Sequence, residues 1–189
     1  MRLLYTTSSQ WVEKVLSDFD GFLLDHAACE RKASGMAMSM LAHYPDKPDL
    51  VKQMTDLAVE ELQHFKMVMR FIEQRGLVMP ADTKDLYVNE LRKLFRREKQ
   101  EYFMDRLIMA SIIELRGCER FFLVAQHCAD EKVKSFYDAI AKSEEKHYEL
   151  FIDLANQYFD PSDVEKRANE LLIVEADIVK ALPLRAALH

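Results

Sequence analysis

The chain has 189 residues, enough for one well-filled domain, and it carries a formal net charge of −6. It has only 4 Gly and 5 Pro, and its many Leu, Ala, Met, Glu and Lys residues favour long helices over hairpins and turns. We therefore expect one all-α domain spanning residues 1–189. The negative net charge excludes attraction of nucleic acid over the whole surface, so any such contact needs a local basic patch.

A short amphipathic helix around Trp11, capped by Ser8 and Ser9, is expected first. Apolar side chains then recur every three or four residues, which predicts four long helices over about residues 18–43, 48–75, 102–128 and 131–158. The segment YPDKPD separates the first two, Gly76 and Pro80 end the second, and ADEK makes a tight turn before the fourth. Residues 82–100 form a polar connection with a short helix, and a terminal helix after DPSD reaches about residue 179.

Two helical hairpins joined by a long crossover have the connectivity of a ferritin-like four-helix bundle. The expected fold is such a bundle, with short accessory helices at both ends of the chain and the crossover between long helices two and three.

The cysteines, Cys29, Cys118 and Cys128, are odd in number and form no CxxC pair. This pattern predicts neither a disulfide framework nor a zinc knuckle, and it favours buried thiols in a reducing cytoplasm. The start, MRLLYTTSSQW, has no apolar core of signal-peptide length, and no apolar run is long enough for a bilayer. We expect a cytoplasmic protein that does not span a membrane.

The second helix of each hairpin carries a glutamate three residues before a histidine. AVEELQHF contains Glu61 and His64, and SEEKHYELF contains Glu144 and His147. Residues three apart share one helix face, so each pair offers an oxygen and a nitrogen ligand to one metal ion. Each glutamate belongs to a Glu-Glu doublet, and only one member of each doublet has the shared offset of three.

The partner glutamate of each hairpin follows from its depth. A helix rises about 1.5 Å per residue, so ligands on antiparallel helices must be equally far from their common turn. With the first turn near residue 46, Glu30 matches Glu61, and near the second turn Glu114 matches Glu144. Glu119 would lie about 6 Å too shallow. The six predicted metal ligands are Glu30, Glu61, His64, Glu114, Glu144 and His147.

A single Glu-x-x-His element is more often a solvated pair than a metal site. Two such elements, each with a depth-matched glutamate in an apolar stripe, would leave six costly polar groups in a core unless two divalent cations neutralised them. Oxygen-rich sites with imidazole suit iron or manganese, and both metals are open on the residues alone.

Small residues lie along the helices near the partner glutamates, among them Ala33, Ala37 and Gly117. They indicate either a cavity beside the metals for oxygen and a substrate, or close helix packing. His26 lies one turn before Glu30 and has two possible roles. It either relays protons or orients a ligand, or it is a hydrogen-bonded structural histidine, which is the more frequent case.

Four blocks, LLDHAACERKASGMAMSMLAHYPD, AVEELQHF, IIELRGCERF and SEEKHYELF, closely resemble the MiaE family over nearly the whole chain. Members of this family are tRNA hydroxylases acting on 2-methylthio-N6-isopentenyladenosine. The resemblance implies a non-haem di-iron monooxygenase that uses O2 to hydroxylate the isopentenyl group of this adenosine beside the anticodon. It places two iron ions on the six predicted ligands. Because the chain has no nicotinamide fingerprint, electrons are expected from a separate reductase or ferredoxin-like partner.

The stretch RKLFRREKQEYFMDR is the best local candidate for contact with tRNA, because it holds six basic and three acidic residues. The predicted contacts are Arg92, Lys93, Arg96, Arg97 and Lys99. The alternative is an ordinary solvated face of a connecting helix.

Two other functions compete with the hydroxylase. A ferritin-like di-iron ferroxidase or peroxidase-type protein without a nucleic-acid substrate would require neither the family blocks nor the basic stretch. A structural helical bundle without metal leaves the six converging ligands unexplained.

Overall fold

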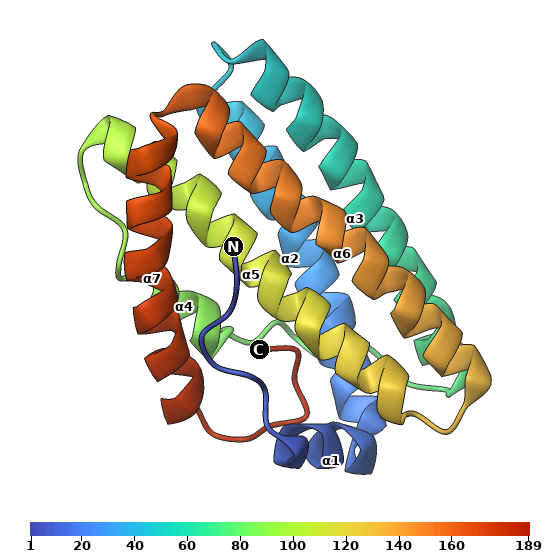
Figure 1. The fold of residues 1–189 in the computed structure, drawn as a ribbon. Coiled ribbons are helices and arrows are strands. Elements are labelled where there is room, and N and C mark those ends of the chain that lie inside the picture. Colours follow the sequence, from blue (N-terminus) through green and yellow to red (C-terminus); the bar gives the residue numbers. More distant parts are fainter. The chain divides into compact units, whose positions relative to one another are not determined.

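The computed structural model describes residues 1–189, and its regular secondary structure is entirely helical, as the composition predicts (Figure 1). Its seven helices are α1 (Ser9–Ser17), α2 (Phe19–His43), α3 (Pro48–Gln74), α4 (Leu86–Arg92), α5 (Lys99–His127), α6 (Glu131–Tyr158) and α7 (Pro161–Ala181). None of them has the length and apolar character needed to cross a membrane.

The chain divides into two units, which we describe separately. The α2/α3 unit consists of Lys14–Thr83 and Arg185–Leu188. The α5/α6 unit consists of Met1–Glu13, Lys84–Leu184 and His189.

In the α2/α3 unit, the two long helices pack against each other as a hairpin. Asp18 caps α2 by accepting a hydrogen bond from the Gly21 backbone N–H at 3.2 Å. A Cβ atom at position 21 would lie only 2.8 Å from Asp18 Oδ1, so a side chain there would push the capping carboxylate aside. Pro48 opens α3 at a position where its missing N–H costs nothing, and Gly76 follows the helix end with a left-handed φ of 68°.

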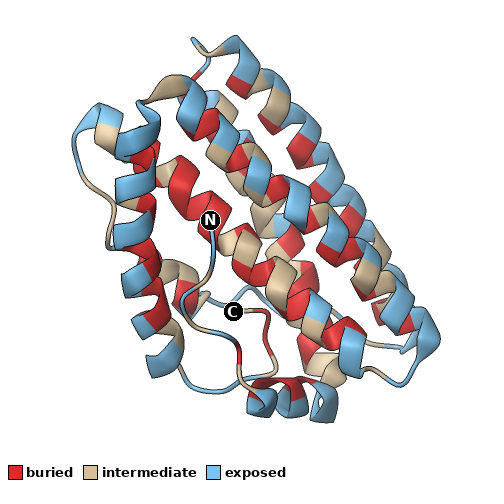
Figure 2. Cartoon of the chain, in the orientation of Figure 1, coloured by how far each residue is buried: buried red, intermediate tan, exposed pale blue.

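In the α5/α6 unit, α5 packs against both α6 and α7. More than half of α5 is buried, 16 of its 29 residues, so this helix is covered on more than one face (Figure 2). Asp130 caps α6 through the backbone N–H groups of Lys132 and Val133, and Asp160 caps α7 through that of Ser162. The predicted ligand on α5, Glu114, therefore lies on the most extensively buried long helix of its unit.

The predicted long helices are confirmed, with small shifts at their ends. The helix 131–158 has the expected bounds, whereas α5 begins at Lys99, three residues before the predicted start. Polar residues 99–101 have good helix propensity, and Glu98, in an extended conformation, is the residue that precedes the helix. The short helix expected in the crossover is α4.

Candidate metal centre

The α2/α3 unit brings together three of the predicted ligands, Glu30 on α2 and Glu61 and His64 on α3. One ligand atom from each lies within 4.8 Å of the others. His64 Nδ1 is 3.5 Å from Glu61 Oε2 and 3.6 Å from Glu30 Oε2. The three residues are at most 5 % exposed. Two carboxylates and an imidazole therefore converge away from solvent.

His26 is fully buried beside this cluster, and its Nε2 lies 2.5 Å from Glu30 Oε1. Burial and, to a smaller extent, the nearby His64 lower the pKa of His26 to about 3, while Glu61 acts in the opposite direction. A neutral imidazole with its proton on Nε2 donates a hydrogen bond to Glu30 Oε1. The other carboxylate oxygen, Oε2, then faces His64. This contact fits both orientation of a ligand and a hydrogen-bonded structural histidine, the more frequent case, and it does not favour a proton relay.

The α5/α6 unit repeats the arrangement with Glu114 on α5 and Glu144 and His147 on α6. One ligand atom from each again lies within 4.8 Å of the others, and His147 Nδ1 is 2.8 Å from Glu144 Oε2. The three side chains are buried. Each hairpin thus presents the same set of two carboxylates and one imidazole, built from equivalent helix positions.

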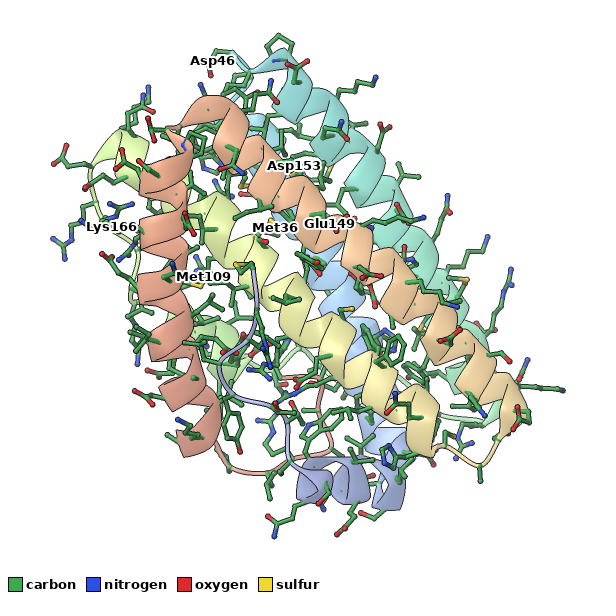
Figure 3. All side chains as sticks on the ribbon, in the orientation of Figure 1. Met36, Asp46, Met109, Glu149, Asp153 and Lys166 are labelled. Atoms are coloured by element: carbon green, nitrogen blue, oxygen red, sulfur yellow. The ribbon has the colours of Figure 1, made fainter.

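The glutamates that the spacing rejects lie elsewhere. Glu60 and Glu145, the second members of the two doublets, are exposed. Along α6 the exposed acidic face continues through Glu149 and Asp153, which Figure 3 labels. Since one residue turns a helix by about 100°, the neighbour of a buried ligand has to leave the ligand face.

Glu119, which the depth argument also rejects, is bound in a different cluster. Its carboxylate accepts hydrogen bonds from the Thr7 backbone N–H at 2.9 Å and from Thr7 Oγ1 at 2.7 Å. Arg116 Nη1 donates to the same carboxylate at 2.5 Å. Glu119 therefore serves the packing of the N-terminal segment on α5.

The three residues predicted to line a cavity differ in their burial. Ala37 and Gly117 are buried, while Ala33 is half-buried. A Cβ atom added at Gly117 would meet only the Phe121 ring, at 3.9 Å, so there is space beside this position. Close helix packing is seen one residue away, where Cys118 Sγ donates to the Ala141 carbonyl at 3.3 Å. The substrate cavity stays a prediction.

A surface depression of about 380 Å³ was not foreseen from the sequence. It runs along α3 and reaches His64, one of the predicted ligands. Its lining consists of Asp56, Val59, Glu60, Gln63, His64 and Met67. These residues recur every three or four positions, which is the periodicity that marks one face of a helix.

The basic stretch is not one continuous helix, because loop residues 93–98 separate Arg92 at the end of α4 from Lys99 at the start of α5. Arg92, Lys93, Arg97 and Lys99 are exposed, as contact with tRNA requires. Arg96 differs, since its guanidinium binds the buried Asp105 and Glu101. The predicted contacts therefore lie partly on helix ends and partly on the loop, and Arg96 has a structural partner.

Sequence reasoning missed the buried ion pairs of the α5/α6 unit. Arg116 and Glu175 are fully buried and form a bidentate pair, with N···O distances of 2.9 and 3.0 Å. Tyr87 donates to the same glutamate at 3.0 Å. Asp105 is held by two arginines, and its position inside the apolar run YFMDRLIM is the signal that would have identified it.

The donor set fits a pair of iron ions. Four carboxylates balance the four positive charges of two ferrous ions, and the two imidazoles supply the nitrogen donors that iron sites commonly contain. The Cys118 thiol does not compete for this role, because burial raises its pKa to about 12 and its Sγ donates to a backbone carbonyl.

Comparison with known proteins gives a consistent result. The family model described as "tRNA-(MS[2]IO[6]A)-hydroxylase (MiaE)" matches residues 1–189. A protein from Pseudomonas putida, named tRNA 2-(methylsulfanyl)-N(6)-isopentenyladenosine(37) hydroxylase, is 34 % identical over 93 % of this chain and 85 % of its own. A protein of the same name from Salmonella typhimurium is 31 % identical over 82 % of this chain, which spans 56 % of that longer relative.

One solved structure resembles the whole chain. "Protein 43 with aldehyde deformylating oxygenase activity from Synechococcus" is 31 % identical, with a TM-score of 0.94 over 98 % of this chain and 93 % of that one. The likeness confirms the predicted ferritin-like, all-α fold. This fold and the buried clusters of carboxylates and histidines are compatible with a di-iron site.

Proposed function

The chain belongs to the MiaE family of tRNA hydroxylases, and from this membership we propose that it hydroxylates the isopentenyl group of 2-methylthio-N6-isopentenyladenosine beside the anticodon of tRNA. The observation that carries the proposal is the pair of buried clusters, each with two glutamates and one histidine, in a chain that matches the family from end to end. Together the clusters provide the ligands of a di-iron centre: Glu30, Glu61, His64, Glu114, Glu144 and His147.

The overall reaction needs dioxygen and external electrons. Conversion of a C–H group into a C–OH group consumes one O2, two electrons and two protons, and it releases one water. Two iron ions bound by these residues would supply the redox chemistry that activates dioxygen for attack on an aliphatic C–H bond. The electrons come from a separate reductase or ferredoxin, and the tRNA substrate places the activity in the cytoplasm.

The side chains of the protein set the conditions for this chemistry. The four glutamates would bind the metal ions and neutralise their positive charge. Their burial keeps bulk water away from the reacting groups. His26 keeps Glu30 in one orientation through the 2.5 Å contact with its Oε1. Its lowered pKa keeps the imidazole neutral, so it acts as a hydrogen-bond donor and adds no positive charge next to the metal ligands.

The exposed residues Arg92, Lys93, Arg97 and Lys99 are the proposed contacts to tRNA phosphates. Arg96 is removed from this set, because its side chain is bound within the protein. Charge reversal at Arg96 would disturb the fold, so Arg92 and Arg97 are the better pair for testing the surface.

Two other substrates deserve a direct comparison. A solved structure that resembles this chain is named for aldehyde deformylating oxygenase activity, so an aldehyde is the second candidate. Ferrous ion itself is the third, corresponding to a ferroxidase. The three candidate activities all require a similar metal site. They can therefore be distinguished only by which substrate the protein converts.

The decisive experiment offers the three substrates to one preparation of protein loaded anaerobically with ferrous iron. The tRNA is taken from cells lacking this chain, and mass spectrometry of its nucleosides detects hydroxylation. Aldehyde conversion is followed by formate release, and iron oxidation by absorbance with no organic substrate. We expect catalytic turnover only with tRNA, supported by a reductase system. Turnover of the aldehyde alone, or sustained iron oxidation alone, would overturn the proposal.

Iron binding is tested without reference to activity. Metal analysis should give about two irons per chain, and Mössbauer spectroscopy should show a coupled pair. A purely mononuclear signal would contradict the six-ligand assignment.

A further inference from the structure

One buried carboxylate, Asp105 on α5, is the centre of a cluster that the chemistry above does not use. Its Oδ1 accepts hydrogen bonds from Arg96 Nη2 at 2.7 Å and from Arg167 Nε at 2.9 Å. Its Oδ2 accepts from the Arg96 backbone N–H at 2.8 Å and from Arg167 Nη2 at 3.1 Å. Asp105 is 0 % exposed. A single carboxylate thus binds two guanidinium groups and one peptide N–H.

The charge on Asp105 is stabilised by these contacts. Burial by itself would raise the pKa of this carboxyl group, but the hydrogen bonds from Arg96 and Arg167 outweigh that effect and hold the pKa below its ordinary value. Hydrogen bonds to an ionised acceptor are shorter and stronger than neutral ones. The ion pairs of Asp105 with Arg96 and Arg167 are therefore strong contacts, and we call this cluster the Asp105 anchor.

What this anchor holds is the loop of residues 93–98. Arg96 is attached through both its backbone and its side chain, and Arg167 Nη2 donates at 3.0 Å to the carbonyl of Leu94. Two points of the six-residue loop are therefore tied, one directly to α5 and the other through Arg167 on α7. Such ties remove much of the freedom that a polar surface loop ordinarily has.

The same loop and its two flanking positions display cations. Arg92, Arg97 and Lys99 are exposed and form no ion pair, while Lys93 is exposed and contacts Glu90. Glu98 is the exposed acidic residue among them. The chain as a whole carries a net charge of −6. This local cluster of positive charge is therefore opposite in sign to the net charge of the protein.

We propose that Asp105 is a positioning residue, which holds loop 93–98 and its cations as a preorganised surface for the phosphate backbone of tRNA. A loop that is already ordered loses less conformational entropy when it binds, and its cations are spaced before the polyanion arrives. The identity of the polyanion rests on the proposed function. The ordering of the loop by Asp105 does not.

Two variants test the anchor. Asp105→Asn keeps the shape of the side chain and removes its charge, and the milder Arg167→Lys keeps the charge of residue 167 and removes the fork that reaches both Asp105 and Leu94. Thr7→Val is the matched control, because it removes a hydrogen bond to Glu119 in the same unit, remote from the loop in sequence. All proteins are loaded with iron and assayed well below their unfolding temperatures.

The expected result is a separation of substrate binding from chemistry. In both anchor variants the KM for tRNA should rise by about tenfold, and the dependence of binding on salt should become shallower as phosphate contacts are lost. The kcat and the activity on the free modified nucleoside should stay within about twofold. Thr7→Val should lose stability and keep its KM for tRNA. An equal fall in activity on both substrates would show a merely structural role and would overturn the proposal.

A second measurement does not depend on catalysis. Hydrogen exchange should show faster exchange of the amides of residues 94–98 in Asp105→Asn, above all at Arg96, whose N–H binds the carboxylate. Binding of a fluorescent RNA stem-loop without the modified base should weaken in parallel. If exchange and RNA binding match the wild type, the positioning role is refuted. If they change while the wild type fails to hydroxylate tRNA, the proposed function fails and the anchored RNA surface stands.

Discussion

Glu114 and Glu119 lie on one helix and should respond in opposite ways to the same substitution. Glu114 offers an oxygen within 4.8 Å of one from Glu144. If both carboxylates are ionised in the metal-free protein, they repel each other by at least about 3.5 kcal/mol at an effective dielectric constant of about 20. Glu114→Gln removes this repulsion but leaves a buried amide. The metal-free variant should therefore be as stable as the wild type, or more stable by up to about 3 kcal/mol.

Glu119→Gln should instead destabilise the protein. It removes a negative charge that faces the fully buried Arg116 and weakens the contacts with Thr7. Loss of a hydrogen bond between charged groups costs about 1–3 kcal/mol. The two positions are five residues apart, or about 7.5 Å along the helix, so Glu119 is too far along α5 to replace Glu114 as a metal ligand.

Urea denaturation of the metal-free proteins, followed by circular dichroism, measures the stability of each variant. Anaerobic titration with ferrous iron measures how many irons each variant binds. We expect Glu114→Gln to keep its stability and to bind fewer than two irons, and Glu119→Gln to lose stability and to bind two. If Glu114→Gln is destabilised as much as Glu119→Gln and still binds two irons, Glu114 is a structural residue and the depth argument is wrong.

Three further predictions concern other buried groups. His26→Phe should weaken ferrous iron binding by about 10- to 100-fold, because Glu30 loses the donor that orients it, and His26→Gln should recover part of the affinity in the same titration. Glu175→Leu should lower the free energy of unfolding by about 3–5 kcal/mol, since it leaves the buried Arg116 without its bidentate partner; adding Arg116→Met should restore much of that loss in urea denaturation. The folded state holds the pKa of Asp105 below its unfolded value of 3.8, so its contribution to stability is complete above that value and is lost as the pH falls through the lower folded pKa. The stability difference between wild type and Asp105→Asn should therefore be constant near neutral pH and shrink below about pH 4; an unchanged difference at pH 3 would show that the carboxylate charge is not what the arginines bind.

Much of the candidate site could be predicted because a helix imposes its geometry locally. An offset of three residues was enough to select Glu61 over Glu60 and Glu144 over Glu145, and the structure buries the first of each pair and exposes the second. Depth along a hairpin needs only the rise per residue and the place of the turn, and it correctly separated Glu119 from the buried clusters. The contact of His26 with Glu30 is also local, since four residues make about one turn.

Helix ends could be predicted to within a few residues for the same reason. Asp18, Asp130 and Asp160 cap the helices that follow them, and the capping bond spans only two or three residues. The crossover was the exception. Its polar composition predicted a connection with a short helix but not the bounds of that helix, because the loop that follows α4, residues 93–98, is held by residues that come later in the chain.

The sequence by itself determined the all-α class, the bounds of the long helices and the identity of the residues on each ligand face, because all of these depend on spacing within about four residues. Only the tertiary structure decided which charges would be buried together. Arg167 reaches Asp105 from 62 residues away, and Arg116 reaches Glu175 across 59 residues. No periodicity encodes such a pairing, because it depends on which helices pack side by side, and the cost of burying a charge is offset only when that packing delivers its partner.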